Sequence, residues 1–112
     1  DTDADYVLEM LKEAESDLLF VGHSHKPYHR ILEMPDGRFK HVINLGSAGK
    51  PKDGDPRGCY VIVHLNEGSS STDKNSIEIE FRRVEYDVQV SATAIINSPL
   101  PDEFADALRL AK

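Results

Sequence analysis

Apolar positions recur at helical spacing between residues 2 and 14 and predict one amphipathic helix. Thr2 and Asp5 form a capping-box pattern at its start. The stripe that this helix is expected to bury consists of Val7, Leu8, Leu11 and Ala14.

Five apolar or alternating segments follow and predict β-strands. Residues 17–22, DLLFVG, read as a buried strand with both faces covered. Residues 28–34 and 39–45 flank the turn sequence PDGR and predict a hairpin. Residues 58–65 form another apolar strand, and residues 76–86 alternate so that one strand face meets water.

Two further helices are predicted after the last strand. The first begins at Asp87, with an apolar stripe at Ala92, Ile95 and Ile96. The second begins at Pro101 and has an apolar face made by Phe104, Ala107 and Leu108. The order predicts an α/β fold with a mostly antiparallel sheet, one N-terminal helix and two C-terminal helices. Because so few parallel-type strands cannot make a doubly wound sheet, we interpret residues 1–112 as a single partial domain.

The charge of the chain excludes some classes of partner. Thirteen Lys and Arg against twenty Asp and Glu give a formal net charge of −7. Nonspecific binding to nucleic acid or an anionic membrane is therefore not expected, because a polyanion would be repelled. The one cysteine, Cys59, lies in an apolar strand and is expected to be a small core residue. With no visible leader or long apolar span, we expect a cytoplasmic protein.

Two histidines directly after the first strand suggest metal chemistry. His23 and His25 are separated by one serine and preceded by Gly22. If the segment is extended, both imidazoles point to one side. The carboxyl end of a buried strand is also the usual ligand position in an α/β sheet. His29, His41 and His64 fall inside predicted strands and are expected to be structural or surface residues.

A second candidate element is the long loop within residues 43–63, which begins after Asn44 and has a glycine or proline at almost every second position. It also carries three cations in an acidic protein, Lys50, Lys52 and Arg57. The segment is either a solvated turn or a shaped loop whose backbone N–H groups and Arg57 face an anionic substrate.

Together, DLLFVGHSHKP (17–27) and INLGSAGKPKDGDPRGCYVIV (43–63) resemble the calcineurin-like metallophosphoesterases. More narrowly, they resemble the YfcE-like phosphodiesterase group. That group carries a strand, then G-H-[TS]-H-x-P, then N-x-G-S-[VA]-G-x-P-[RK]-x-G-D-P-R. Both patterns, their order and their separation agree with this sequence.

The resemblance implies the C-terminal half of a four-layer α/β/β/α metallophosphoesterase sandwich. It implies two divalent ions (Mn, Fe, Ni or Zn), with His23 ligating one and His25 the other. A metal-bridged hydroxide would then attack a phosphate ester or nucleotide. By the same resemblance, Asn44, Gly46 and Ser47 would shape the neighbouring loop, and Arg57 would contact substrate.

The remaining ligand motifs of that family, D-x-H, G-D-x-x-D, G-N-H-[ED] and a further G-H, do not occur in these residues. The histidine that acts as general acid is likewise expected upstream, so no catalytic residue is assigned here. We therefore expect the 112 residues alone to be inactive. The expected partner is the missing N-terminal half of the domain or a second copy that covers exposed apolar surface.

Two other interpretations remain open at the level of sequence. The chain could belong to a non-catalytic scaffold of the same fold, although a scaffold has no chemical need for His23 and His25. It could also be a self-contained metal module that uses these histidines with His29 or a carboxylate.

Overall fold

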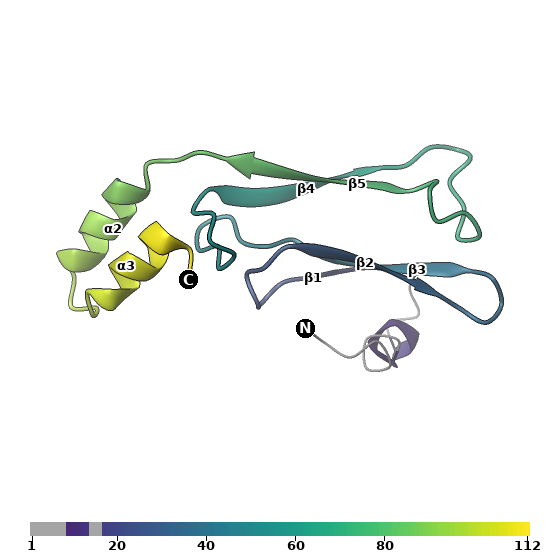
Figure 1. The fold of residues 1–112 in the computed structure, drawn as a ribbon, viewed down its shortest axis with the longest axis horizontal. Helices are drawn as coiled ribbons and strands as arrows, with labels where there is room; N and C mark the ends of the chain where they lie inside the picture. Colours follow the sequence, from purple (N-terminus) through teal and green to yellow (C-terminus); the bar gives the residue numbers. More distant parts are fainter. Residues whose placement is uncertain (1–8, 14–16) are drawn as a thin grey trace.

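The computed structural model describes residues 9–13 and 17–112 (Figure 1). Three strands form one sheet, called sheet A, in the order β1-β3-β2: β1 (Leu18–Val21), β2 (Tyr28–Glu33) and β3 (Phe39–Asn44). A second sheet, called sheet B, consists of β4 (Gly58–His64) and β5 (Glu78–Val84). All five predicted strands are confirmed.

The pairing is parallel between β1 and β3 and antiparallel within β2–β3 and β4–β5. The predicted hairpin turn is confirmed at Gly37, which has a φ of 83° and donates its N–H to the Met34 carbonyl at 3.0 Å. Glycine suits this left-handed conformation because it lacks a Cβ. The result is the predicted α/β arrangement with mostly antiparallel strands.

Sheet A is covered on both faces along its central strand. On one face, Val42 of β3 packs against Leu11 of the helical residues 9–13, and both side chains are fully buried. Because side chains alternate along a strand, His41 and Ile43 point to the other face, toward sheet B. Figure 1 shows the helical residues and the two sheets as successive layers.

The predicted N-terminal helix can be checked only in part. Residues 9–13 are helical and Leu11 is buried, as predicted. The start signal and the rest of the stripe lie outside the described residues: Thr2, Asp5, Val7, Leu8 and Ala14.

β1 was expected to be buried on both faces, and that prediction is wrong. Among the strands that the structure describes, it is an edge strand paired with β3 alone, and Phe20 is 43% exposed. A continuous apolar run indicates that both faces of a strand are covered. It does not indicate whether the strand is hydrogen-bonded to another strand on each side. The buried central strand is β3, in which residues 41 to 44 are all buried.

The C-terminal helices are α2 (Val88–Ile96) and α3 (Glu103–Leu110). Asp87 caps α2 as predicted, since its carboxylate accepts the Gln89 N–H at 3.2 Å. Pro101 instead precedes α3, whose N-cap is Asp102. None of the described helices is long and apolar enough to cross a membrane.

The predicted apolar faces of these helices are partly wrong. Ile96 and Phe104 are 42% and 40% exposed, whereas Ala92, Ala105 and Leu108 are buried. The two helices pack on each other beyond the end of the sheets (Figure 1). The buried side chains of the two helices are therefore two alanines and one leucine, whereas Ile96 and Phe104 stay partly exposed to solvent.

The described chain is elongated. Its principal extents are 55 × 28 × 19 Å and its radius of gyration is 17.3 Å, against about 13 Å for a compact domain of this length. Large apolar side chains are accordingly exposed along the sheets as well as on the helices, among them Phe20, Ile31, Tyr60 and Val84.

Candidate metal corner

The candidate site lies at one edge of sheet A, where two parallel strands end. Val21 of β1 is in register with Asn44 of β3. The segments that follow these strands, residues 22–25 and 45–57, therefore start side by side. We call residues 22–25 together with Asn44 the metal corner.

The backbone of the metal corner is not extended. His23 and His25 have φ values of 78° and 59°, and the Ser24 N–H donates to the Gly22 carbonyl at 3.0 Å. The prediction that an extended segment aims both imidazoles to one side is therefore wrong. A left-handed conformation is uncommon for a residue with a side chain, although histidine adopts it more readily than most. Such conformations cluster at functional sites, where the surrounding structure holds them.

His25 is fixed by the loop that follows β3. Its Nδ1 lies 2.7 Å from the Lys50 carbonyl, and its own carbonyl accepts the Lys52 N–H at 3.0 Å. A carbonyl can only accept, so Nδ1 carries the proton and the lone pair of the neutral ring is on Nε2. Metal-binding histidines are commonly oriented in this way, with one ring N–H on a carbonyl and the other nitrogen on the metal.

Asn44 joins the two sides of the corner. Its side chain is 2% exposed, and its Nδ2 donates to Ser24 Oγ at 3.0 Å and to the Gly22 carbonyl at 3.3 Å. Its Oδ1 accepts the Gly46 N–H at 2.9 Å. One buried amide thus ties the start of the histidine segment to the start of the next loop.

Gly46 and Ser47 also act within the loop. A Cβ on Gly46, whose φ is 73°, would lie 3.2 Å from Cys59 Cβ and 3.3 Å from Pro27 Cβ. Ser47 Oγ accepts the Lys50 N–H at 2.8 Å. Gly46 therefore allows a close approach of three segments, and Ser47 fixes the residue whose carbonyl holds His25.

The backbone N–H groups of this loop are largely used inside the protein. Those of Gly46 and Lys52 donate to Asn44 and His25 of the metal corner, and that of Lys50 donates to Ser47 Oγ within the loop. That of Gly54 donates to the Ala111 carbonyl at 3.0 Å. The expectation that loop N–H groups face an anionic substrate is wrong for these four. The glycines and prolines serve packing instead.

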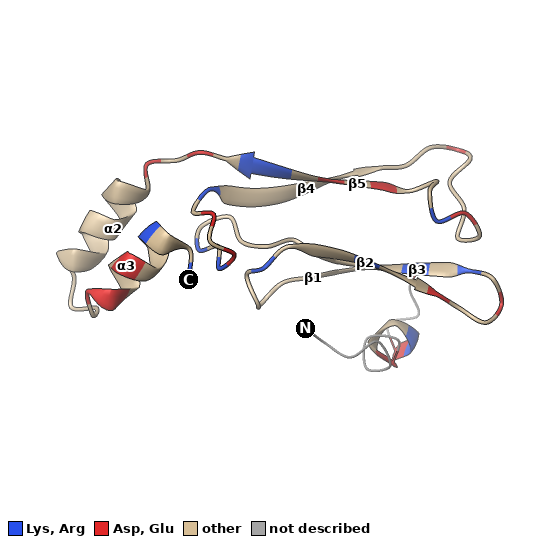
Figure 2. Cartoon of the chain, viewed as in Figure 1, with Lys and Arg blue, Asp and Glu red and all other residues tan. Residues whose placement is uncertain are grey.

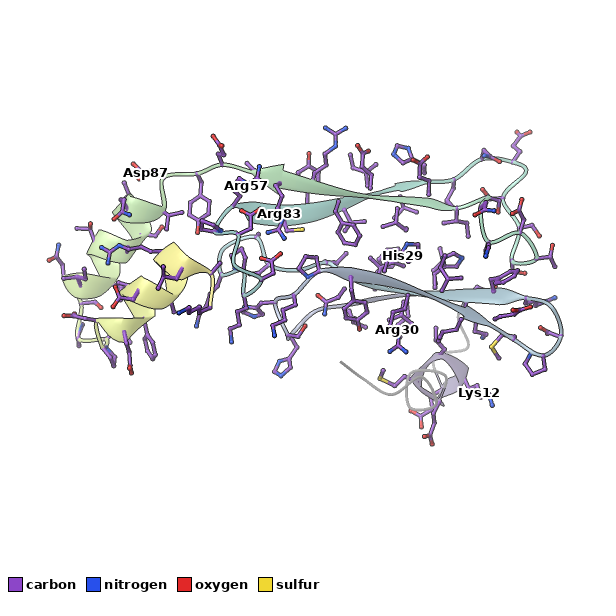
Figure 3. The ribbon with its side chains drawn as sticks, in the orientation of Figure 1. Lys12, His29, Arg30, Arg57, Arg83 and Asp87 are labelled. Atoms are coloured by element: carbon purple, nitrogen blue, oxygen red, sulfur yellow. The ribbon has the colours of Figure 1, made fainter. Side chains whose placement is uncertain are left out.

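Arg57 belongs to a charge network in the same loop. Its Nη2 and Nε donate to the Asp55 carboxylate at 2.8 and 3.0 Å. These hydrogen bonds hold the pKa of Asp55 at about 2. Arg83 of β5 also pairs with Asp53 and Asp55 (Figure 3), and Figure 2 shows charges of both signs gathered in the loop. Sequence reasoning missed Arg83, because nothing local links it to residues 30 positions away.

The other titratable candidates lie outside the corner. His29 and His41 bond to each other inside the fold, and exposed His64 pairs with Glu80 at 3.1 Å, as expected for structural and surface histidines. Cys59 is 5% exposed and burial raises its pKa, which fits a core residue.

Within residues 9–13 and 17–112, no three His, Cys, Asp or Glu side chains are grouped closely enough to hold a metal ion. A self-contained metal module is therefore not supported in the described residues.

Comparison with known proteins places the fold. No protein-family profile matches the chain. An uncharacterized protein of Methanocaldococcus jannaschii, MJ0912, is 33% identical over 106 residues, which cover 86% of this chain and 40% of that protein. A metallophosphoesterase structure from Sphaerobacter thermophilus superposes with a TM-score of 0.63 and 24% identity, over 87% of this chain and 42% of that one.

A Vps29 double mutant and a zinc complex of wild-type Vps29, both from Entamoeba histolytica, have TM-scores of 0.47 and 0.46 at 18% and 19% identity. These alignments cover 74% and 72% of this chain, and 48% and 47% of the Vps29 chains. The superposition on the Sphaerobacter metallophosphoesterase shows that the described chain has the fold of part of a calcineurin-like domain. The chain spans about two fifths of the length of MJ0912 and of that metallophosphoesterase.

Proposed function

We propose that this chain is the C-terminal part of a dinuclear metal-dependent phosphoesterase of the YfcE-like group, to which it supplies two imidazole ligands. The observation that carries the proposal is the fixed ring of His25, whose Nδ1 is bonded to the Lys50 carbonyl so that Nε2 presents a lone pair. His23, exposed on the same short segment, is the second proposed ligand. A non-catalytic scaffold would gain nothing from two left-handed histidines and a fixed tautomer.

The donor set fits part of a metal site. Neutral imidazole suits Zn, Fe and Ni, and with oxygen donors also Mn. When bound, two such cations would stabilise charge on a phosphoryl group and make water a stronger nucleophile. The chain's own contribution is to hold the proposed ligands: Asn44 ties the histidine segment to the neighbouring loop, and the Lys50 carbonyl orients His25.

We further propose that the other ligands and the general acid come from a segment outside these residues that joins sheet A at the free edge of β1. Three observations support this partner. β1 is an edge strand, Phe20 on it is 43% exposed, and the chain spans only two fifths of the length of MJ0912 and of the metallophosphoesterase. An unpaired strand edge with an apolar side chain is suited to accept a further strand.

Hydrolysis of bis-p-nitrophenyl phosphate tests the proposal. The 112-residue chain is compared with the complete translated polypeptide in which it occurs, each with Mn²⁺, with Zn²⁺ and with EDTA. We expect metal-dependent turnover by the complete polypeptide and none by the chain alone, because two ligands are too few to hold two metals. Robust turnover by the chain alone, or none by the complete polypeptide with any metal, would contradict the proposal.

A further inference from the structure

The interior between the two sheets contains a pair of imidazoles that the proposed phosphoesterase chemistry does not use. His29 of β2 and His41 of β3 are hydrogen-bonded, Nε2 to Nδ1, at 2.9 Å, and their rings are stacked with centroids 5.2 Å apart. His41 is 1% exposed. Sheets of this size are normally joined by apolar side chains, so a polar pair at this position calls for a physical explanation.

Both imidazoles point toward sheet B. Val42, between His41 and Ile43, points to the opposite face and packs on Leu11. Figure 3 shows His29 between the sheets and Arg30 on the other side of sheet A. The pair therefore occupies the layer that sheet B covers.

We infer that the His29–His41 pair is an acid-sensitive latch, which lets the two sheets pack at neutral pH and separates them in mild acid. In the neutral pair, one ring donates and the other accepts. Two protonated rings have four N–H donors and no acceptor, so the hydrogen bond is lost and two like charges lie 2.9 Å apart in a buried layer.

The surrounding groups do not offset these charges. By strand alternation, Glu33 shares the face of His29 but is exposed, and the neighbours on β1 are apolar. On the inner face of sheet B, Cys59 is neutral and Arg83 is held by Asp53 and Asp55. Burial lowers the pKa of His29, and burial together with His29 lowers the pKa of His41. No carboxylate contributes to either shift.

The direction of the pH effect follows from these shifts. The unfolded chain takes up protons at about pH 6.5, the ordinary pKa of histidine, whereas the folded pair resists protonation. The contribution of the neutral pair to the free energy of unfolding is therefore fully present above that pH. It is lost as the pH drops toward the lower pKa values of the folded pair. With two protons bound on unfolding, the unfolding equilibrium constant rises by up to about 100-fold for each pH unit.

Urea unfolding of the 112-residue chain between pH 7.5 and 5.0 tests the latch in metal-free buffer. We expect the wild type to take up nearly two more protons on unfolding than the double variant His29→Val and His41→Val. The free energy of unfolding of the wild type should therefore fall more steeply as the pH is lowered. The control His64→Gln, which removes an exposed imidazole, should keep most of the wild-type pH dependence of the free energy of unfolding. An unchanged slope in the double variant would overturn the inference.

A second measurement keeps the test decisive if the double variant does not fold. In ¹⁵N-labelled wild-type chain, we expect the ring nitrogens of His29 and His41 to stay neutral below pH 6.5, the ordinary pKa of histidine, until the folded signals disappear. Ordinary titration of both rings near pH 6.5 with the fold intact would show that the pair is no latch. Neither result depends on phosphoesterase activity, so the latch and the proposed function can fail separately.

Discussion

Substituting His25 with asparagine in the complete polypeptide is expected to lower kcat/KM for bis-p-nitrophenyl phosphate by at least about 10- to 100-fold, since loss of a ligand costs at least as much as loss of its supporting hydrogen bond. Asparagine is chosen because it tolerates the φ of 59° better than alanine does. The variant removes the imidazole whose Nδ1 is held by the Lys50 carbonyl. Steady-state kinetics over a range of Mn²⁺ and Zn²⁺ concentrations measure the effect.

His64→Asn is the matched control for that experiment. Like His25, His64 is a histidine whose ring has a polar partner, but it lies exposed on sheet B beside Glu80, away from the metal corner. It should keep wild-type kinetics. If His25→Asn also kept wild-type kcat/KM at every metal concentration, His25 would not be a ligand.

Substituting Asn44 with alanine is expected to destabilise the 112-residue chain by about 1–3 kcal/mol, the usual cost of leaving buried polar groups without partners. The amide is 2% exposed and serves Ser24, Gly22 and Gly46 at once. Its loss should also release the histidine segment from the loop after β3. Urea unfolding measures the stability, and amide exchange of residues 22–25 measures the release.

Asn75→Ala controls for the generic effect of removing an amide, because Asn75 is exposed in the polar loop between β4 and β5. We expect it to lie within about 0.5 kcal/mol of the wild type. If the two variants were equally stable and amide exchange at residues 22–25 were unchanged, Asn44 would not be the residue that holds the histidine segment against the loop after β3.

Local patterns predicted the elements well. Alternation and apolar runs located all five strands, PDGR located the hairpin turn, and Asp87 located the start of α2. These features depend on short-range backbone preferences, which a sequence displays directly.

Features that depend on distant neighbours were missed. The apolar run of β1 gave no sign that the strand lies at an edge, and the apolar spacing in α3 did not show that Phe104 stays 40% exposed. The left-handed backbone at His23 and His25 occurs where Ser24 bonds to Asn44 and His25 bonds to Lys50, both distant in sequence. The ion pair of Arg83 with Asp53 joins residues 30 positions apart, and no local pattern encodes it.

The resemblance to metallophosphoesterases supplied the candidate ligands, and the structure supplied a reason for one of them. By its residue type alone, His25 cannot be told from the other four histidines of the sequence. The Lys50 carbonyl on its Nδ1 distinguishes it from His41, whose ring bonds to another histidine, and from His64, whose ring bonds to a carboxylate. The hydrogen bond to the Lys50 carbonyl, rather than the residue type, therefore distinguishes His25 from these histidines.

Paramagnetic broadening by Mn²⁺ in the ¹⁵N-labelled 112-residue chain tests the metal corner most directly, because it detects weak binding and needs no catalysis. We predict that substoichiometric Mn²⁺ broadens the amide signals of residues 22–25 and 44–47 first, and that His25→Asn abolishes this effect. Broadening centred on the carboxylates of Asp53 and Asp55, or of the loop at residues 66–75, with residues 22–25 unaffected, would contradict the account.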